Sequence, residues 1–418
     1  MSNSVPEGWN IYSLDELGQV VGGGTPESNN TDYWGGDIYW ATPKEITKLS
    51  SRYINKTERT ITQDGLDRSS AKLHPIGTIL LTSRASVGYP AINTIPMATN
   101  QGFQSLRPNN KLDTEYGYQC LLNSRNKLEK LSAGSTFLEI SSKEVKKFKV
   151  VIPPLPEQKK IAAILTSVDT VIEKTQAQID KLKDLKTGMM QELLTKGIGH
   201  TEFKDSPVGR IPVEWGVVTV LELGNGHKDT VQTGPFGAQL HSKDYVEEGI
   251  PLVLIKNIKE DGLDDTDIPK ITEKDANRLS RYRLKEGDIV FSRVGRVGSC
   301  FLCSKNEEGW VFSGQTLRIR FNNSKVDLTY FNYALRTEEI QKELIGESVG
   351  STRSSINTTI LESLSVKLPP IQEQKKIASI LQSLDSNIKS RELKLKQLMS
   401  VKKALMQDLL TGKVRVKV

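Results

Sequence analysis

The sequence predicts an α+β protein with two globular domains in tandem duplication, separated by two long helices that form an antiparallel coiled coil with pseudo-two-fold symmetry. One observation behind this prediction is a repeat: PPLPEQKKIAAIL begins at Pro153 and PPIQEQKKIASIL begins at Pro369, 216 positions later. From these prolines, 43 residues align without a gap and 20 of them are identical. The other observations are a heptad spacing of apolar residues in both copies and short β-rich runs ahead of them. Two copies are too few for a solenoid, which favours a pair of related domains.

Residues 1–152 and 213–368 are predicted to form the globular domains. Both contain short β-rich runs, such as GTILLTS from Gly77 and GDIVFSRV from Gly287, between turns rich in Gly, Asn, Thr and Ser. The runs occur in the same order in both segments, but the residues between them differ. We therefore expect two domains of one fold with different surfaces. One helix is expected in each domain, near residues 115–131 and 329–345.

The repeated segments, residues 153–197 and 369–418, each predict one long helix. A Pro-Pro pair ends the preceding strand and suits the first turn of a helix. Apolar residues then recur in alternating steps of four and three, which is the heptad pattern of helices that pair side by side. The residues expected to pair the helices are Ile161, Leu165, Val168, Ile172, Leu182, Ile377, Leu381, Leu384, Ile388 and Leu398.

Polar residues interrupt this apolar seam at equivalent places, for example at Lys186 and Lys402. A polar residue in a seam costs stability but fixes the alignment of the helices, so the matched positions predict one defined register. After the first helix, Gly197, Gly199 and the stretch DSPVGRIP predict a linker over residues 198–212.

The composition is ordinary for a soluble globular protein, with 37% hydrophobic and 26% charged residues among 418. No run approaches the 18 apolar residues of a membrane span, and the N-terminus lacks the basic start and apolar core of a signal peptide. Three cysteines do not make a disulfide framework. These features predict a cytoplasmic protein with no membrane contact.

The positive charge is local. The chain has a net charge of +7, and residues 369–418 alone hold eleven Lys and Arg against four Asp and Glu. The remainder is therefore neutral overall. A nucleic acid would have to be bound through local basic patches, and a solvated helix face is the plain alternative for the basic tail.

Motifs of catalysis are missing from the sequence. It has no P-loop, no H-E-x-x-H and no motif of the amino-methyltransferases, and its histidines lie far apart, at His74, His200, His227 and His241. Cys300 and Cys303 form a single C-x-x-C, but a structural zinc site needs two more ligands. Because the flanks read as strand and turn, two ordinary buried or half-buried thiols are expected. We predict neither catalytic residues nor a metal site.

What remains is a set of basic and amide residues on predicted loops. Arg and Lys read guanine in the major groove of DNA, and Asn and Gln read adenine. Arg84 and Arg293 both follow a serine at the end of corresponding strands, so we expect the duplication to place them equivalently. The candidate DNA-binding residues are Lys44, Arg84, Gln101, Gln232, Lys256, Arg293, Arg296 and Gln315.

Over essentially its whole length, the chain resembles the specificity subunit of type I restriction–modification enzymes. The resemblance rests on the two repeated motifs quoted above, on MMQELLTKG and LMQDLLTGK near the helix ends, and on the linker FKDSPVGRIPVEW. One departure is that the second domain opens with VEW where the first has EGW. We expect no functional consequence from it.

The resemblance implies that each globular domain is a target recognition domain for one half of a split, asymmetric site on double-stranded DNA. The paired helices then set the gap between the half-sites. It further implies docking of two modification subunits, which methylate adenine with S-adenosylmethionine, and of restriction subunits that use ATP and Mg²⁺. The specificity chain itself would hold no cofactor and perform no catalysis.

Two other functions stay open at the level of sequence. A coiled-coil adaptor whose globular domains bind proteins fits the composition, because those domains are not net basic. A stand-alone nuclease or methyltransferase is disfavoured by the missing motifs. DNA binding that weakens steeply with salt separates the first alternative from DNA recognition, since phosphate contacts release counterions.

Overall fold

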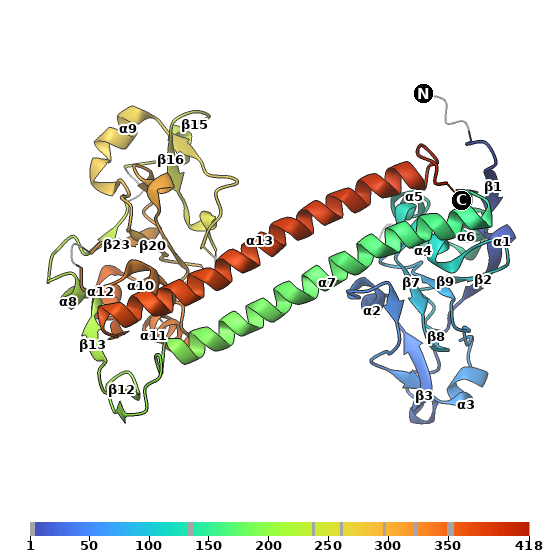
Figure 1. Ribbon diagram of the computed structural model, residues 1–418, viewed down its shortest axis with the longest axis horizontal. Helices are drawn as coiled ribbons and strands as arrows, with labels where there is room; N and C mark the ends of the chain where they lie inside the picture. The colour runs from blue at the N-terminus through green and yellow to red at the C-terminus, as the bar shows by residue number, and fades with distance from the viewer. Residues whose placement is uncertain are drawn as a thin grey trace. The chain divides into compact units, whose positions relative to one another are not determined.

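The chain forms two compact units, each with one globular domain and half of each long helix. The computed structural model describes residues 5–132, 138–235, 239–259, 262–295, 298–321, 324–348 and 355–417. Unit 1 comprises Met1–Ile179 and Ser390–Val418, and unit 2 comprises Asp180–Lys389. The long helices, α7 (Leu155–Leu193) and α13 (Ile371–Leu409), have 39 residues each and lie side by side within each unit (Figure 1). Among the described residues, no helix is long and apolar enough to cross a membrane.

The domain of unit 1 has two main sheets. A five-stranded sheet has the order β2-β9-β6-β7-β4, and a three-stranded sheet has the order β5-β3-β8. The strands are β2 (Gly18–Gly22), β9 (Gln104–Pro108), β6 (Ile79–Leu81), β7 (Pro90–Asn93), β4 (Tyr53–Ile54), β5 (Thr60–Ile61), β3 (Trp34–Ala41) and β8 (Ala98–Thr99). A separate antiparallel pair, β1 (Asn10–Ser13) with β10 (Lys149–Ile152), joins the two ends of the domain. The short helices are α1 (Leu14–Leu17), α2 (Pro43–Thr47), α3 (Gln63–Asp67) and α6 (Ser142–Lys147), with a 3₁₀ turn η1 (Thr31–Tyr33).

The central strand β6 is buried on both faces. Ile79 and Leu81 point into a core that also contains residues of both long helices, and Leu80 points the other way, into the core with Phe103. Because side chains alternate along a strand, one apolar run supplies both cores. The continuous apolar run Ile79–Leu81 within GTILLTS is explained by burial of both faces of this strand.

The domain of unit 2 repeats the plan. Its sheets have the orders β14-β23-β20-β21 and β15-β19-β16-β22, with the pairs β13-β24 and β17-β18. Ile289 and Phe291 of its central strand face one core, and Val290 faces another. The strands are β13 (Gly216–Thr219), β14 (Val231–Thr233), β15 (Tyr245–Val246), β16 (Ile250–Val253), β17 (Ile258–Lys259), β18 (Gly262–Leu263), β19 (Lys270–Ile271), β20 (Ile289–Ser292), β21 (Cys300–Leu302), β22 (Val311–Phe312), β23 (Thr316–Ile319) and β24 (Ser365–Leu368). The short helices are α8 (Val220–Leu223), α9 (Glu273–Arg278) and α12 (Thr358–Ser363), with 3₁₀ turns η2 (Ser242–Asp244), η3 (Ile255–Asn257), η4 (Ser280–Tyr282) and η5 (Lys305–Glu307).

Each helix that we expected inside a domain is divided in two. The first domain has α4 (Thr114–Asn123) and α5 (Arg125–Lys130), and the second has α10 (Leu328–Ala334) and α11 (Glu338–Ser348). An aspartate caps the first helix of each pair, at Asp113 and Asp327. The expected linker over residues 198–212 contains a short antiparallel pair, β11 (Phe203–Lys204) with β12 (Ile211–Pro212).

The lysines that interrupt the seam form ion pairs across the two helices. Lys186 Nζ lies 2.6 Å from Asp385 Oδ1 in unit 2, and Lys402 Nζ lies 2.6 Å from Asp169 Oδ1 in unit 1. The two pairs are related by the 216-residue repeat. Each aspartate also accepts a hydrogen bond of 2.6 Å from its domain, from Tyr333 on α10 or from Gln119 on α4. One carboxylate thus aligns both helices and the domain in each unit.

The residues predicted to pair the helices divide into two groups. Half of them are fully buried, and Ile161 and Leu165 pack with Leu409 and Leu410 of the opposite helix end and with the domain core. The other half are only partly buried, because the middle of a two-helix pair keeps one side in water. The buried group is Ile161, Leu165, Ile377, Leu381 and Ile388, and the half-buried group is Val168, Ile172, Leu182, Leu384 and Leu398.

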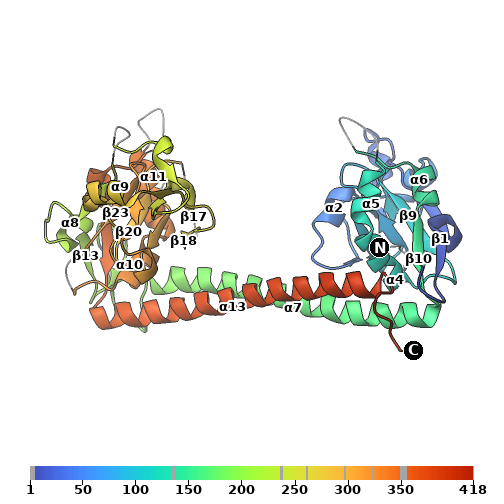
Figure 2. The ribbon, with the colours of Figure 1, turned by 90° about the horizontal axis from the view of Figure 1, so that it is seen from above.

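The glutamine of the repeated motif fixes each domain on its helix. Gln158 is buried; its Oε1 accepts the backbone N–H of Asp113 at 2.8 Å, and its Nε2 donates to the carbonyls of Lys111 and Pro153 at 2.9 Å. Gln374 makes the same three bonds in unit 2. Its partners are Asp327, Lys325 and Pro369. This side chain binds the entrance of α4 or α10, so these helices lie against α7 and α13 (Figure 2).

The glutamate of the motif binds a buried tryptophan. Trp9 Nε1 donates to Glu157 Oε2 at 3.2 Å, and Trp215 Nε1 donates to Glu373 Oε2 at 2.9 Å. A second side chain also contacts each carboxylate. It is Arg415 for Glu157 and His200 for Glu373. The motifs EGW and VEW therefore differ at their first two positions but both keep the tryptophan that binds the glutamate.

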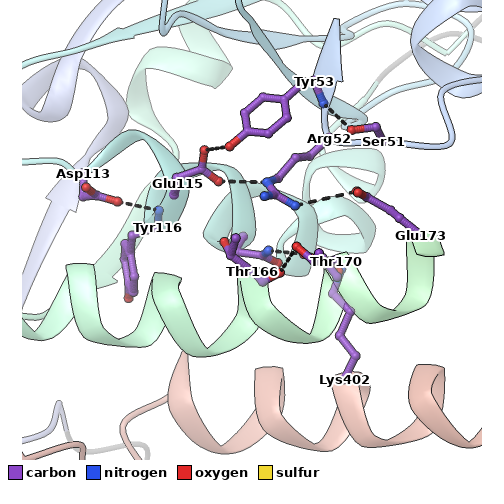
Figure 3. A network of polar contacts seen from close by, with 12 residues as sticks. Ser51, Arg52, Tyr53, Asp113, Glu115, Tyr116, Thr166, Thr170, Glu173 and Lys402 are labelled. Carbon is purple, nitrogen blue, oxygen red and sulfur yellow. Dashed lines mark hydrogen bonds and ion pairs between the residues drawn. The ribbon is translucent and has the colours of Figure 1, made fainter. Parts of the chain in front are cut away.

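Unit 1 has one further polar anchor. Arg52 is only 8% exposed, and its guanidinium lies 3.1 Å from Glu115 of α4 and 3.6 Å from Glu173 of α7 (Figure 3). Tyr53 donates to the same Glu115. Two carboxylates compensate the cost of burying the cation. The segment before β4 is thereby tied to the long helix.

We expect Gln158→Ala and Gln374→Ala each to lower the free energy of unfolding by about 1–3 kcal/mol, because each leaves buried backbone groups without partners. Chemical denaturation measures this loss. The exposed Gln372 lies on α13, like Gln374, and supplies the control Gln372→Ala, which should change the free energy of unfolding little. Equal stability of all three variants would contradict the anchoring role.

Unit 2 is one continuous stretch of chain, whereas unit 1 needs residues from both ends. A fragment of residues 180–389 should therefore fold alone, with a cooperative thermal transition by circular dichroism. A fragment of residues 1–179 lacks Leu409, Leu410 and Lys402 and should be markedly less stable. If both fragments unfolded alike, these helix-end contacts would not be important.

Candidate nucleic-acid interface

Three loops of the first domain line an open cavity of about 600 Å³. One loop follows β3 and enters α2, one is the turn after β6, and one follows β8. A fourth segment, before β5, adds Glu58. The lining residues are Thr42, Pro43, Lys44, Glu58, Arg84, Ala85, Asn100, Gln101 and Gly102.

Backbone hydrogen bonds hold these loops together. Asn100 N donates to Ala41 O at 3.0 Å, and Ser83 N donates to Gly102 O at 2.7 Å. The Asn100 side chain accepts the N–H of Gly102 at 2.8 Å and closes a tight turn. Ala85 has a φ of +62°, which is costly for a residue with a Cβ. Such strain gathers at functional sites, and here it lies beside Arg84.

The structure brings together the three candidate residues of the first domain. Lys44, Arg84 and Gln101 come from three different loops and line the same cavity. Lys44 and Gln101 are exposed, and the oxygen of the Gln101 amide is bonded to the hydroxyl of Thr25. Arg84 Nε lies 3.6 Å from Glu139, with both side chains about half exposed. The guanidinium is therefore accessible to a ligand.

The second domain builds the same three loops. Ser313 N donates to Val253 O at 3.0 Å and Arg293 N donates to Gln315 O at 3.1 Å, which repeats the two bonds of the first domain. Lys256 in η3 takes the place of Lys44. Its Nζ lies 2.5 Å from Asp267 Oδ2. The equivalence of the two lysines was not recognised from the sequence, because the runs around them are unlike.

The expected equivalence of Arg84 and Arg293 is wrong by one residue. The backbone of Arg293 makes the hydrogen bonds that the backbone of Ser83 makes. The backbone of Arg84 forms an antiparallel β-bridge with Glu139, and it is Val294 that forms the corresponding β-bridge, with Ser355. Successive side chains of an extended segment point to opposite sides. The two arginines therefore leave the backbone in different directions, and each domain offers its own arrangement of charge.

The other candidates of the second domain are less uniform. Gln315 is exposed and Arg293 is half-buried. Gln232 lies on β14, is only 7% exposed, and has an Nε2 without a partner among the described residues, so DNA does not reach it in this conformation. Arg296 lies outside the described residues. Glu58 and Asn100 also line the cavity of the first domain but were not among the predicted residues, although Asn100 directly precedes Gln101, which was.

The described residues show no candidate metal site. They contain no group of three His, Cys, Asp or Glu side chains that could hold a metal ion. Burial lowers the pKa of His74 to about 4. Burial raises the pKa of both Cys300 and Cys303, which disfavours the reactive thiolate, and both thiols are buried, as expected.

Comparison with known proteins gives one consistent result. The family model described as "Type I restriction modification DNA specificity domain" matches residues 6–184 and again residues 212–399. The MjaIX specificity subunit of a type I restriction enzyme from Methanocaldococcus jannaschii is 30% identical, with 99% of this chain and 95% of that protein covered. The EcoKI specificity subunit of Escherichia coli is 22% identical over 92% of this chain and 83% of that protein.

A solved structure agrees in fold. The S subunit of a type I restriction–modification system from M. genitalium superposes with a TM-score of 0.63 at 16% identity, and 98% of each chain is covered. Both halves of the chain match the same family model, and the relatives are similar along nearly its full length. The chain therefore belongs to the family of type I restriction–modification DNA specificity domains.

Proposed function

We propose that this chain is the sequence-specific DNA-recognition subunit of a type I restriction–modification complex. Each globular domain reads one half of a bipartite, asymmetric site on double-stranded DNA, and the paired helices set the gap between the halves. The observation that carries the proposal is the set of three loops present at the same place in both domains. The same backbone arrangement presents different side chains in the two domains, as recognition of two unlike half-sites requires.

The chemistry of the loops suits DNA. Lys44 and Arg84 can donate to guanine or to phosphate, and the amides of Asn100 and Gln101 can bond to base edges. Lys256, Arg293 and Gln315 offer a comparable but rearranged set. Cations placed locally on these loops let a domain that is nearly neutral overall still bind a polyanion.

We further propose that the chain has no catalytic activity of its own and holds no cofactor. Methylation then belongs to two modification subunits that use S-adenosylmethionine, and cleavage to restriction subunits that use ATP and Mg²⁺. The buried thiols and the dispersed histidines of the described residues support this division. A cytoplasmic location completes the proposal, since the DNA and the partner subunits are there.

The lysines shared by both domains give the first test. Lys44→Ala and Lys256→Ala should each weaken DNA binding and, where the lysine contacts phosphate, lower the slope of log affinity against log salt by about 1. Fluorescence anisotropy at several salt concentrations measures both effects. Lys130→Ala, an exposed lysine on α5, is the matched control. If the first two variants bound like the control, these loops would not meet DNA.

The spacer role gives the second test. Seven residues, one heptad, are inserted after Ile179 in α7 and after Lys389 in α13, which keeps the Lys186–Asp385 and Lys402–Asp169 pairs in register. At 1.5 Å per residue each helix grows by about 10.5 Å, close to the rise of three base pairs. Selection of bound duplexes should show a longer gap with both half-sites unchanged. Altered half-site bases would contradict the spacer role.

A further inference from the structure

We propose that Glu58 reads the amino group of a cytosine in the half-site of the first domain. This inference rests on the proposed function. It assigns one base pair of the recognised sequence to one cavity. Among the residues that line the cavity, Glu58 is the one carboxylate, and its side chain has no bonding partner among the described residues.

The position of Glu58 is fixed by the same device that caps α2. Glu45 accepts from Thr42 N at 2.7 Å through one oxygen and from Glu58 N at 2.7 Å through the other. The segment that carries Glu58 is therefore attached to the loop that carries Lys44. The backbone of Glu58 is held in this way, and its exposed side chain lines the cavity.

The remaining polar groups of the cavity are mainly donors. Lys44 and Arg84 can only donate. Asn100 uses its oxygen to hold Gly102, which leaves its amide N–H groups as the donors that it can offer. The oxygen of Gln101 is likewise bonded to Thr25. Glu58 is thus an acceptor among donors.

The unpaired carboxylate makes the interior of this cavity a poorer site for phosphate than for a base edge, because its charge repels phosphate. Donors next to one acceptor match a G·C pair in the major groove. Guanine offers O6 and N7 as acceptors, and cytosine offers its N4 amino group as a donor. A·T pairs present one acceptor and one donor on adenine and fit Glu58 less well, since Asn and Gln suit that pattern better.

The test maps the methylated motif in a host that expresses the chain with its modification partner. Wild type, Glu58→Ala and Glu58→Gln are compared with Glu129→Gln, an exposed carboxylate on α5 outside the cavity. Glu58→Ala should relax one G·C position of one half-site, with discrimination there reduced roughly 5- to 150-fold. Glu58→Gln should move the preference at that position towards adenine. The second half-site and the Glu129→Gln motif should stay as in wild type.

Three results would overturn the inference: an unchanged motif in both Glu58 variants, relaxation at an A·T position, or a uniform loss of methylation at all positions in a chain that remains folded. Circular dichroism of the purified variants establishes folding. A failure of the proposed function has a different signature, because wild type itself would then give no bipartite motif.

Discussion

The structure depends on how each globular domain is held to a long helix. In both units a glutamate and the glutamine after it turn one helix face into an anchor: Glu157 and Gln158 in unit 1, and Glu373 and Gln374 in unit 2. The glutamine side chain bonds to backbone groups at the start of the domain helix, α4 or α10. The glutamate accepts a hydrogen bond from the indole N–H of a tryptophan. Buried polar side chains with all their bonds made give orientation as well as stability. A domain held in this way presents its loops in a fixed direction.

The duplication is strongest where the anchoring is, and weaker in the loops that we propose meet DNA. The helix segments keep 20 of 43 residues identical, and these include the glutamate and the glutamine. In the loops the backbone bonds and one lysine position are repeated. Lys44 and Lys256 occupy equivalent positions, whereas Arg84 corresponds to Val294 and Ser83 corresponds to Arg293. Anchors must stay the same to hold the same geometry, and reading residues must differ to read different bases.

Periodicity and the repeat were sufficient to predict the tandem α+β plan, the long helices and the importance of register at Lys186 and Lys402. They did not predict that each internal helix is divided, because a local break at Ser124 has no periodic signal. Three residues that were selected in the first domain, Lys44, Arg84 and Gln101, line one cavity, although their meeting there was not predicted. Glu58, which lines the same cavity, was not selected because only basic and amide side chains were considered. The error at Arg293 came from matching letters, a serine before an arginine, where the hydrogen-bond register of the strand decides the position.

The measurement that tests the account most directly is methylome mapping in a host that expresses this chain with and without its modification partner. The account predicts a split, adenine-methylated motif that appears only when both are present, with two different half-sites. A soluble complex that produces no new motif, or a continuous motif without a gap, would contradict recognition by two separate domains.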